Sequence, residues 1–580
     1  MSGSVRIDRD RPMEMRDGVV LRADVYRPSD RAKHPAIFIR TPYNKQLTTG
    51  TGDFLNIANA AFSGYAVVIQ DVRGKFASGG EYNRHDRLTV DGADGYDSVE
   101  WIAGQPWCDG NVGMGGASYL ASLQWIVAME NPPHLKAISP WLSAAWTVHD
   151  QTLMGGTGYL TLAVNVVQRS VQDMADRLEK EGQDVSKLRQ MLVQFAANPE
   201  AVYNFLPLKD VPRTKFAGVR EAWEVWQDNL LNCIPGPELA GKAHWSYHRI
   251  TVPVYHMDGW YDHHTWATFQ NFQGMRDEGA SPQARQGQHL LIGPWVHSSQ
   301  LGNTAGIVHF GAAASGTAGL VSERAIAFYN KYLRGMKVSL PVIRYFVMGK
   351  GVWREADTWP LPSTKWRRVF FHSQGRANTS AGDGMLSWDE PVSEPPDIFV
   401  YNPQFPVPTV GGRLSALVPG PLDQSRIERR PDILCYTTAE LEDDIEVTGP
   451  IEVHLMTATS ARDTDFTAKL IDVYPDGQAL NVAEGIIRAR YRKSIFQPEL
   501  LEPGKVYEYT INLGHTSQLF RRGHRIRLDI SSSNFPASDR NMNTGNAVGE
   551  DAEGIPARQT IYHQPGCQSY FDLPVIPPAK

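Results

Sequence analysis

The chain has 580 residues, which is too many for one hydrophobic core, because single cores stop growing at about 250–300 residues. With 42% hydrophobic residues, 21% charged residues and a formal net charge of −6, the composition is that of a globular protein. A mildly acidic chain without a basic stripe disfavours nucleic acid and anionic membranes as partners. We therefore expect two or three globular domains.

The cysteines and the apolar runs exclude further classes. The four cysteines are scattered and form no C-x-x-C pair, which disfavours a structural zinc site and a disulfide framework. The N-terminal stretch is polar and charged and does not resemble a signal peptide. The sequence contains no run of about 18 apolar residues, which a membrane-spanning helix would need. These features predict a cytoplasmic protein without a membrane partner. They leave open whether it forms a homo-oligomer.

The first 145 residues show an α/β pattern. Residues 13–28 predict a hairpin that turns at Asp17-Gly18. The runs 36–39 and 66–69 are apolar on both faces, which is typical of interior strands in a mostly parallel sheet. Helices are expected around 53–62 and over 91–101, with a strand at 112–114.

The pattern changes near residue 146. Val164, Val167 and Val171 recur at helical spacing, a second helical run covers about 186–206, and no strand is evident up to about 245. We interpret 146–245 as a helical cap inserted into the α/β domain. Strands return at 252–256 and 289–293, followed by a helix over 325–333, so that 246–345 completes the α/β domain.

From residue 346 to 580 helical patterns disappear. Ile451, Val453 and Leu455 alternate with polar residues, and so do Ile526 and Leu528. Alternation with period two between Gly, Pro and Asp turns predicts an antiparallel β-sandwich.

A glycine-rich turn at 115–121, GGASYLA, lies between the strand at 112–114 and a helical stretch. An acyl-transfer nucleophile projects its hydroxyl from a sharp turn, which requires small neighbours, and Ser118 has them. The helix N-terminus behind it offers N–H groups to a developing oxyanion. Serines beside glycines are also common in ordinary turns, so this motif alone does not establish the function.

Chain order adds support, because α/β-hydrolases place nucleophile, acid and base in that order at the ends of strands. Asp262 follows the strand at 252–256, and His297 follows the strand at 289–292. We therefore expect Ser118, Asp262 and His297 to be catalytic. Asp258 is a rival for the acid because it lies closer to the strand.

Over nearly its whole length the chain resembles the family of cocaine esterase, α-amino-acid ester hydrolases and X-prolyl dipeptidyl aminopeptidases. The resemblance is carried by RTPYNK at 40–45, QDVRGKFASGGEY at 70–82, DGADGYDSVEW at 91–101, GGASYL at 115–120, DGWYD at 258–262 and GPWVHS at 293–298, and in the second half by YNPQFPVPTVGG at 401–412, DTDFTAKLIDVYPDG at 463–477 and GHRIRLDISSSNFPASDRNMNTG at 523–545. Ala121 departs from the pattern, since many relatives have glycine there.

The resemblance implies an α/β-hydrolase domain with an inserted helical cap and a C-terminal jelly-roll β-sandwich. It assigns the nucleophile to Ser118, the acid to Asp262 and the base to His297. It also implies that the hydroxyl of Tyr43 and the backbone N–H of Tyr119 stabilise the oxyanion. No cofactor is implied.

Three further groups of residues invite functional interpretations. His256, Asp258, Asp262, His263 and His264 lie close in sequence, but a strand and its loop do not place ligands on one face, so we expect no catalytic metal. Asp71 and Arg73 fit a network that braces a loop better than a catalytic role. Trp146, Trp260 and Trp266 are candidates to line the substrate pocket.

The sequence thus predicts a serine hydrolase that cleaves small-molecule carboxylic esters through an acyl-enzyme. The same triad would also suit an amidase, an X-Pro dipeptidyl peptidase or an acyltransferase. A binding protein built around the sandwich is a different alternative, which turnover of any ester would exclude.

Overall fold

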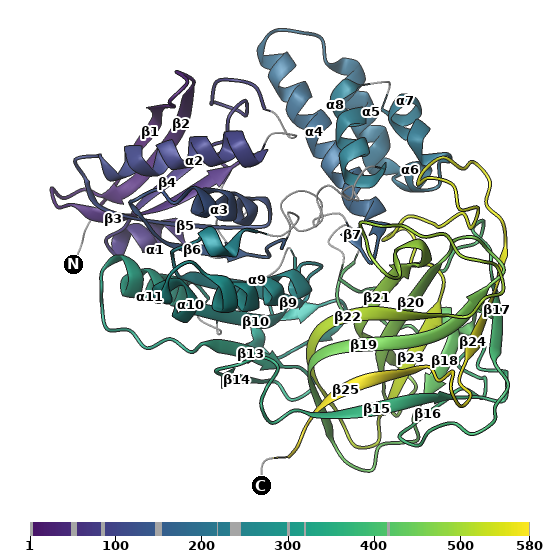
Figure 1. The fold of residues 1–580 in the computed structure, drawn as a ribbon. Helices are drawn as coiled ribbons and strands as arrows, with labels where there is room; N and C mark the ends of the chain where they lie inside the picture. The colour runs from purple at the N-terminus through teal and green to yellow at the C-terminus, as the bar shows by residue number, and fades with distance from the viewer. Residues whose placement is uncertain are drawn as a thin grey trace.

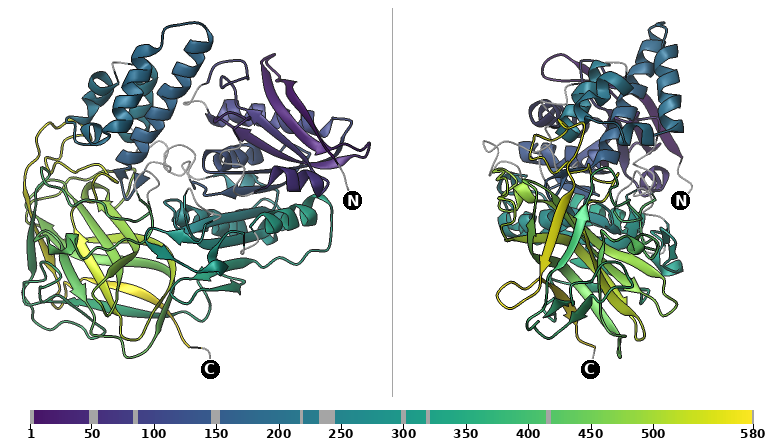
Figure 2. Two further views of the ribbon diagram at one scale, coloured as in Figure 1. Left: turned by 180° about the vertical axis from the view of Figure 1, so that it is seen from behind. Right: turned by 90° about the vertical axis from the view of Figure 1, so that its right-hand side faces the viewer.

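The computed structural model describes residues 4–47, 55–82, 87–145, 153–216, 219–231, 245–297, 302–317, 321–413 and 418–578. Three parts can be distinguished in Figure 1: an α/β part at the left, a helical part at the top and a β-rich part at the lower right. The same arrangement is seen from behind and from the side (Figure 2). None of the described helices is long and apolar enough to cross a lipid bilayer.

The α/β part is built from two stretches of the chain. The first contains β1 (Val5–Glu14), β2 (Val20–Pro28), β3 (His34–Thr41), α1 (Ile57–Phe62), β4 (Ala66–Asp71), α2 (Arg87–Ala103), β5 (Cys108–Ala117), α3 (Tyr119–Glu130) and β6 (Leu135–Trp141). The second contains β9 (Val254–Tyr261), α9 (Thr265–Glu278), α10 (Pro282–Gln286), β10 (Gln288–Val296), β11 (Thr304–Ala305), β12 (Val308–His309), α11 (Val321–Leu333), β13 (Ile343–Val347) and β14 (Val352–Ala356).

The strands of both stretches join one ten-stranded sheet with the order β1-β2-β4-β3-β5-β6-β9-β10-β13-β14. The central pairs from β4 to β13 are parallel, and the pairs at both edges are antiparallel. Every residue of β4, β9 and β10 is buried, and for β4 the apolar run at 66–69 predicted this. Because parallel strands end at the same edge, the loops after β5, β9 and β10 meet there.

The helical part contains α4 (Leu160–Lys180), α5 (Ser186–Ala197), α6 (Glu200–Tyr203), α7 (Val211–Lys215) and α8 (Arg220–Trp226). The expectation that it contains no strand is wrong in one detail. A hairpin of β7 (Leu153–Met154) and β8 (Thr157–Gly158) precedes α4. Strands of two residues are too short to show a period in the sequence.

The C-terminal part contains β15 (Lys365–His372), β16 (Met385–Ser387), β17 (Asp397–Tyr401), β18 (Leu434–Thr437), β19 (Ile445–Thr459), β20 (Asp465–Val473), β21 (Ala479–Arg488), β22 (Tyr507–Phe520), β23 (Arg525–Ser531), β24 (Ala557–Tyr562) and β25 (Tyr570–Ile576). Its pairings are antiparallel except for the single contact between β16 and β18. The predicted β-sandwich is therefore present.

The hydrophobic core is continuous from the α/β part into the sandwich. Trp260 and Ile292 of the α/β sheet belong to the same buried cluster as Trp359, Ile511 and Phe520. Contiguous apolar burial across the boundary holds the two parts in a fixed relation.

The β7–β8 hairpin attaches the cap to the sandwich. The Arg488 N–H donates to Gly155 O at 2.8 Å, and the Asp539 N–H donates to Gly158 O at 3.0 Å. A Cβ atom at Gly155, whose φ is +54°, would lie only 1.8 Å from Ile486 O. The turn therefore requires glycine for both its conformation and its close approach to β21.

We expect Gly155→Ala to lower the melting temperature much more than Gly182→Ala. Gly182 also has a positive φ, of +78°, but a Cβ there would meet nothing within 4 Å. Both substitutions incur the left-handed backbone cost of about 1–2 kcal/mol, whereas only Gly155→Ala forces the hairpin away from the sandwich. Thermal unfolding followed by circular dichroism measures the difference. Equal effects would show that the close approach contributes nothing to stability.

Candidate active site

Ser118 lies at the sharp turn between β5 and α3. Its φ of 60° and ψ of −119° fall in a strained region for a residue with a side chain. Gly116 has a φ of +141°, and a Cβ there would lie 2.6 Å from the Leu120 side chain. The backbone thus requires glycine at position 116. The half-buried serine stands at the sheet edge where the parallel strands end.

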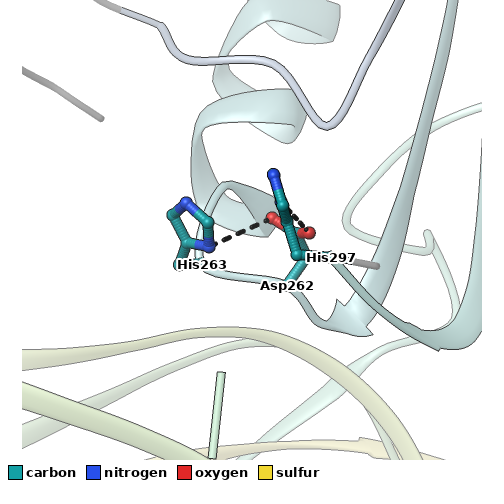
Figure 3. Close-up of side chains that lie close together, drawn as sticks. All are labelled: Asp262, His263 and His297. Carbon is teal, nitrogen blue, oxygen red and sulfur yellow. Dashed lines mark hydrogen bonds and ion pairs between the residues drawn. The ribbon is translucent and has the colours of Figure 1, made fainter. Parts of the chain in front are cut away.

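The structure brings Ser118, His297 and Asp262 together from three separate loops. His297 Nε2 lies 3.1 Å from Ser118 Oγ, and His297 Nδ1 lies 2.7 Å from Asp262 Oδ2. Figure 3 shows the His297 ring beside the Asp262 carboxylate. This geometry allows proton transfer from the serine hydroxyl to an imidazole that a carboxylate orients.

Asp262 is fully buried, yet its carboxylate is held in the ionised form. Burial raises the pKa of Asp262, but the neighbouring imidazoles of His297 and His263 and the hydrogen bond from His297 outweigh burial and bring the pKa below its usual range. The His264 N–H donates to Oδ1 at 2.7 Å, which fixes the carboxylate plane. The acid is therefore both charged and oriented.

Asp258, the rival acid, lies inside β9 because that strand runs to Tyr261, beyond the end predicted at residue 256. Its Oδ2 accepts the Thr268 hydroxyl at 2.5 Å and its Oδ1 accepts the Gly259 N–H at 2.7 Å. Burial, and then the charge of Asp262, raise the pKa of Asp258 well above its usual range. These contacts direct the carboxyl group toward Thr268 rather than His297.

Tyrosines surround the N-terminus of α3. The Tyr43 and Tyr119 rings meet edge to face with centroids 6.2 Å apart. The Tyr119 hydroxyl lies 2.8 Å from the Tyr82 hydroxyl. Because Tyr119 is the first residue of α3, its backbone N–H belongs to the turn whose amides point out of the helix. The cap also reaches this cluster, since the Arg169 guanidinium of α4 lies 5.6 Å from the Tyr43 ring centroid.

The tryptophans proposed for the pocket have different surroundings. Trp260 is fully buried and donates its indole N–H to Phe346 O at 2.8 Å, so it is a core residue and the expectation for it is wrong. Trp266 lines a groove of about 760 Å³ between α9 and the sandwich, and Ser118, Asp262 and His297 are not among the residues lining that groove. Trp146 lies outside the described residues.

The histidines close to Asp262 in sequence are buried. His256 binds Gln288 through Nε2 at 2.8 Å, and burial lowers the pKa of His256 to about 4. His263 and His264 are less than 4% exposed, and the His263 ring lies 4.6 Å from the His297 ring between centroids. His263 therefore packs against the His297 ring.

The loop after β4 is braced, as the sequence suggested, although Asp71 and Arg73 do not bind each other. Arg73 pairs with Asp94 and Asp17, at 2.6 and 2.8 Å. Asp71 accepts the Lys45 N–H at 2.7 Å, and burial raises the pKa of Asp71 to about 6. This network supports the segment that carries Tyr43.

Sequence reasoning missed two contacts around the site. Tyr82 is the last residue of the motif QDVRGKFASGGEY at 70–82, but nothing in that motif indicates the hydrogen bond between the Tyr82 and Tyr119 hydroxyls. Lys75 and Asp173 form an ion pair of 2.5 Å that joins the loop after β4 to cap helix α4. The two residues are 98 positions apart in the chain, and only the position of the cap in the folded protein brings them together.

Comparisons with known proteins identify both main parts of the chain. Residues 17–299 match the X-Pro dipeptidyl-peptidase (S15) family, and residues 336–572 match the X-Pro dipeptidyl-peptidase C-terminal non-catalytic domain. The chain is 35% identical to cocaine esterase from Rhodococcus sp. (strain MB1 Bresler), with 99% of this chain and 100% of the relative covered.

Solved structures agree in fold. An aminopeptidase from the marine sediment archaeon Thaumarchaeota archaeon has a TM-score of 0.75 at 22% identity and covers 100% of this chain and 97% of its own. An α-amino acid ester hydrolase has a TM-score of 0.74 at 23% identity and covers 98% and 96%. With full-length similarity to cocaine esterase and this shared fold, the chain belongs to the S15 and cocaine esterase family of serine hydrolases, built from an α/β-hydrolase domain and a β-sandwich.

Proposed function

We propose that the protein is a carboxylic-ester hydrolase in which Ser118 is the nucleophile, His297 the general base and Asp262 the residue that orients the base. The observation that carries the proposal is the continuous chain of contacts from Asp262 Oδ2 through His297 to Ser118 Oγ, at 2.7 and 3.1 Å. The sequence similarity to cocaine esterase supports an ester as the substrate.

Acylation begins when Ser118 Oγ attacks the ester carbonyl carbon and His297 Nε2 takes the hydroxyl proton. Asp262 accepts the Nδ1–H and stabilises the imidazolium that forms. The tetrahedral intermediate then collapses, and Nε2 gives its proton to the leaving alcohol. Water attacks the acyl-enzyme by the same route, with His297 again as base, and releases the carboxylic acid.

The oxyanion is stabilised by the Tyr43 hydroxyl and the Tyr119 backbone N–H. The amide lies at the positive end of the helix dipole of α3. A phenol donor suits the site because its high pKa keeps it protonated while it faces the oxygen that gains charge. The edge contact of the Tyr43 ring with Tyr119 and the approach of the Arg169 guanidinium to that ring support this role, because they tie Tyr43 to the first residue of α3.

Cleavage of X-Pro amides is the second candidate, because residues 17–299 match the X-Pro dipeptidyl-peptidase family. A panel of p-nitrophenyl esters, amino-acid esters and X-Pro anilides separates the two activities. We expect kcat/KM to be highest for an ester. An X-Pro anilide as the best substrate would reassign the protein as a peptidase with the same site.

Ser118→Ala is expected to reduce kcat on the best ester by about 10³-fold or more. The melting temperature should hardly change, because the substitution removes a single hydroxyl from a half-buried residue. Steady-state kinetics and thermal unfolding measure the two effects. A variant with activity within tenfold of wild type would show that Ser118 is not the nucleophile.

Asp262→Asn should reduce kcat far more than Asp258→Asn at neutral pH. Asparagine at 262 presents an amide that no longer holds His297 in the reactive tautomer. At 258 the carboxyl group binds Gly259 and Thr268 rather than His297, so the amide leaves the His297 tautomer unchanged. The two variants serve as mutual controls because both sites are fully buried. The reverse ranking would transfer the role to Asp258.

Tyr43→Phe is expected to reduce kcat by about 10²–10³-fold, equivalent to about 2.7–4 kcal/mol of lost transition-state stabilisation. KM should change much less, because the ground-state carbonyl is a poorer acceptor than the oxyanion. Tyr82→Phe is the matched control, since it removes a neighbouring hydroxyl that binds Tyr119. An unchanged kcat in Tyr43→Phe would show that the Tyr43 hydroxyl does not stabilise the oxyanion and that the residue only lines the site.

A further inference from the structure

We propose that Asp262, His263 and His297 form a binding site for a divalent metal ion of the zinc type, and that its occupation reversibly inhibits the enzyme. Each of the three side chains offers a ligand atom, and these atoms lie within 4.8 Å of one another. Figure 3 shows the two imidazoles flanking the Asp262 carboxylate. The inhibition rests on the proposed role of His297, whereas the metal site does not.

The orientation of His263 carries the proposal. His263 Nδ1 is buried without a hydrogen-bond partner and faces Asp262 Oδ1 at a distance of 3.8 Å. The Arg413 backbone forms a hydrogen bond with the His263 ring. The Arg413 N–H already donates to Glu484 Oε1, so the Arg413 carbonyl accepts from His263. The ring proton therefore resides on Nε2, and Nδ1 directs a lone pair at a carboxylate oxygen.

Two acceptors that face each other in a buried site favour a cation between them. Two imidazole nitrogens and one carboxylate are a ligand set that zinc takes in proteins, with a water completing the tetrahedron. Bonds of about 2.0–2.2 Å require ligand atoms about 3.4 Å apart in a tetrahedron. His263 Nδ1 lies 3.8 Å from Asp262 Oδ1, and His297 Nδ1 lies 2.7 Å from Asp262 Oδ2. Small adjustments of these side chains would bring the ligand atoms to that separation.

Metal binding would inhibit through the tautomer of His297. The ion needs the lone pair of Nδ1, so the single proton of the neutral imidazole moves to Nε2. Nε2 lies 3.1 Å from Ser118 Oγ and would then donate a proton instead of accepting one. Ser118 would keep its hydroxyl proton and would not attack. Removal of the ion restores the original tautomer.

The test is isothermal titration of the full-length protein with Zn²⁺, together with Zn²⁺ inhibition of ester hydrolysis and its reversal by EDTA. We expect one zinc per chain in wild type and weakening by about tenfold or more in His263→Gln, because a ligand is lost. His264→Gln is the matched control, since His264 is equally buried in the same loop but is not one of the three ligands. Its zinc affinity should stay within threefold of wild type.

The outcomes separate this inference from the proposed function. Zinc binding that depends on His263 in a protein that hydrolyses no ester would support the metal site and reject the esterase. Ester hydrolysis with no zinc bound, or with equal zinc affinity in His263→Gln and wild type, would overturn the metal site alone. Should His263→Gln lose its native circular dichroism, zinc-soaked wild-type crystals decide. An anomalous peak between Asp262 and His263 is expected, and its absence at an inhibitory zinc concentration overturns the proposal.

Discussion

The backbone of Ser118, held at a φ of 60° between β5 and α3, is the constraint on which the site depends. Such a conformation costs about 1–3 kcal/mol and persists only where the surroundings over-determine it. Here α3 supplies that support, because every residue from Tyr119 to Met129 is buried. The same turn places the Ser118 hydroxyl at the carboxyl end of β5 and the Tyr119 amide at the N-terminus of α3. A single strained residue therefore sets the position of both groups.

The β-sandwich contacts the residues around the site through Arg413. Its Arg413 is buried, and the guanidinium approaches the carbonyl oxygens of Glu484 and His515 while the backbone contacts His263. The core that joins Trp260 to Trp359 fixes this contact in place. A shift of the sandwich would therefore move the residues packed against His297, which links the fold of the second domain to the chemistry of the first.

The sequence allowed the main elements and the three central residues to be predicted, because strand periodicity and chain order are local signals. Ser118, Asp262 and His297 each follow a strand, and the parallel sheet necessarily brings such ends together. Trp260 was misjudged because proximity to Asp262 in sequence does not say which face of β9 it occupies. The approach of His263 to His297 was also invisible, since the two residues belong to neighbouring strand ends and no spacing rule relates them.

Asp258 and Asp262 show what separates the predicted acid from its rival in the sequence. Both carboxyl groups are fully buried and lie four residues apart, yet the pKa of Asp258 is raised and that of Asp262 is lowered. The difference lies in their donors. Asp258 receives neutral donors, a hydroxyl and an amide, which compensate little for lost hydration, whereas Asp262 is bound by the imidazole of His297, a group that can carry a positive charge. A charged acid is useful only where a positive charge develops beside it, and that partner is delivered by β10, a distant segment of the chain.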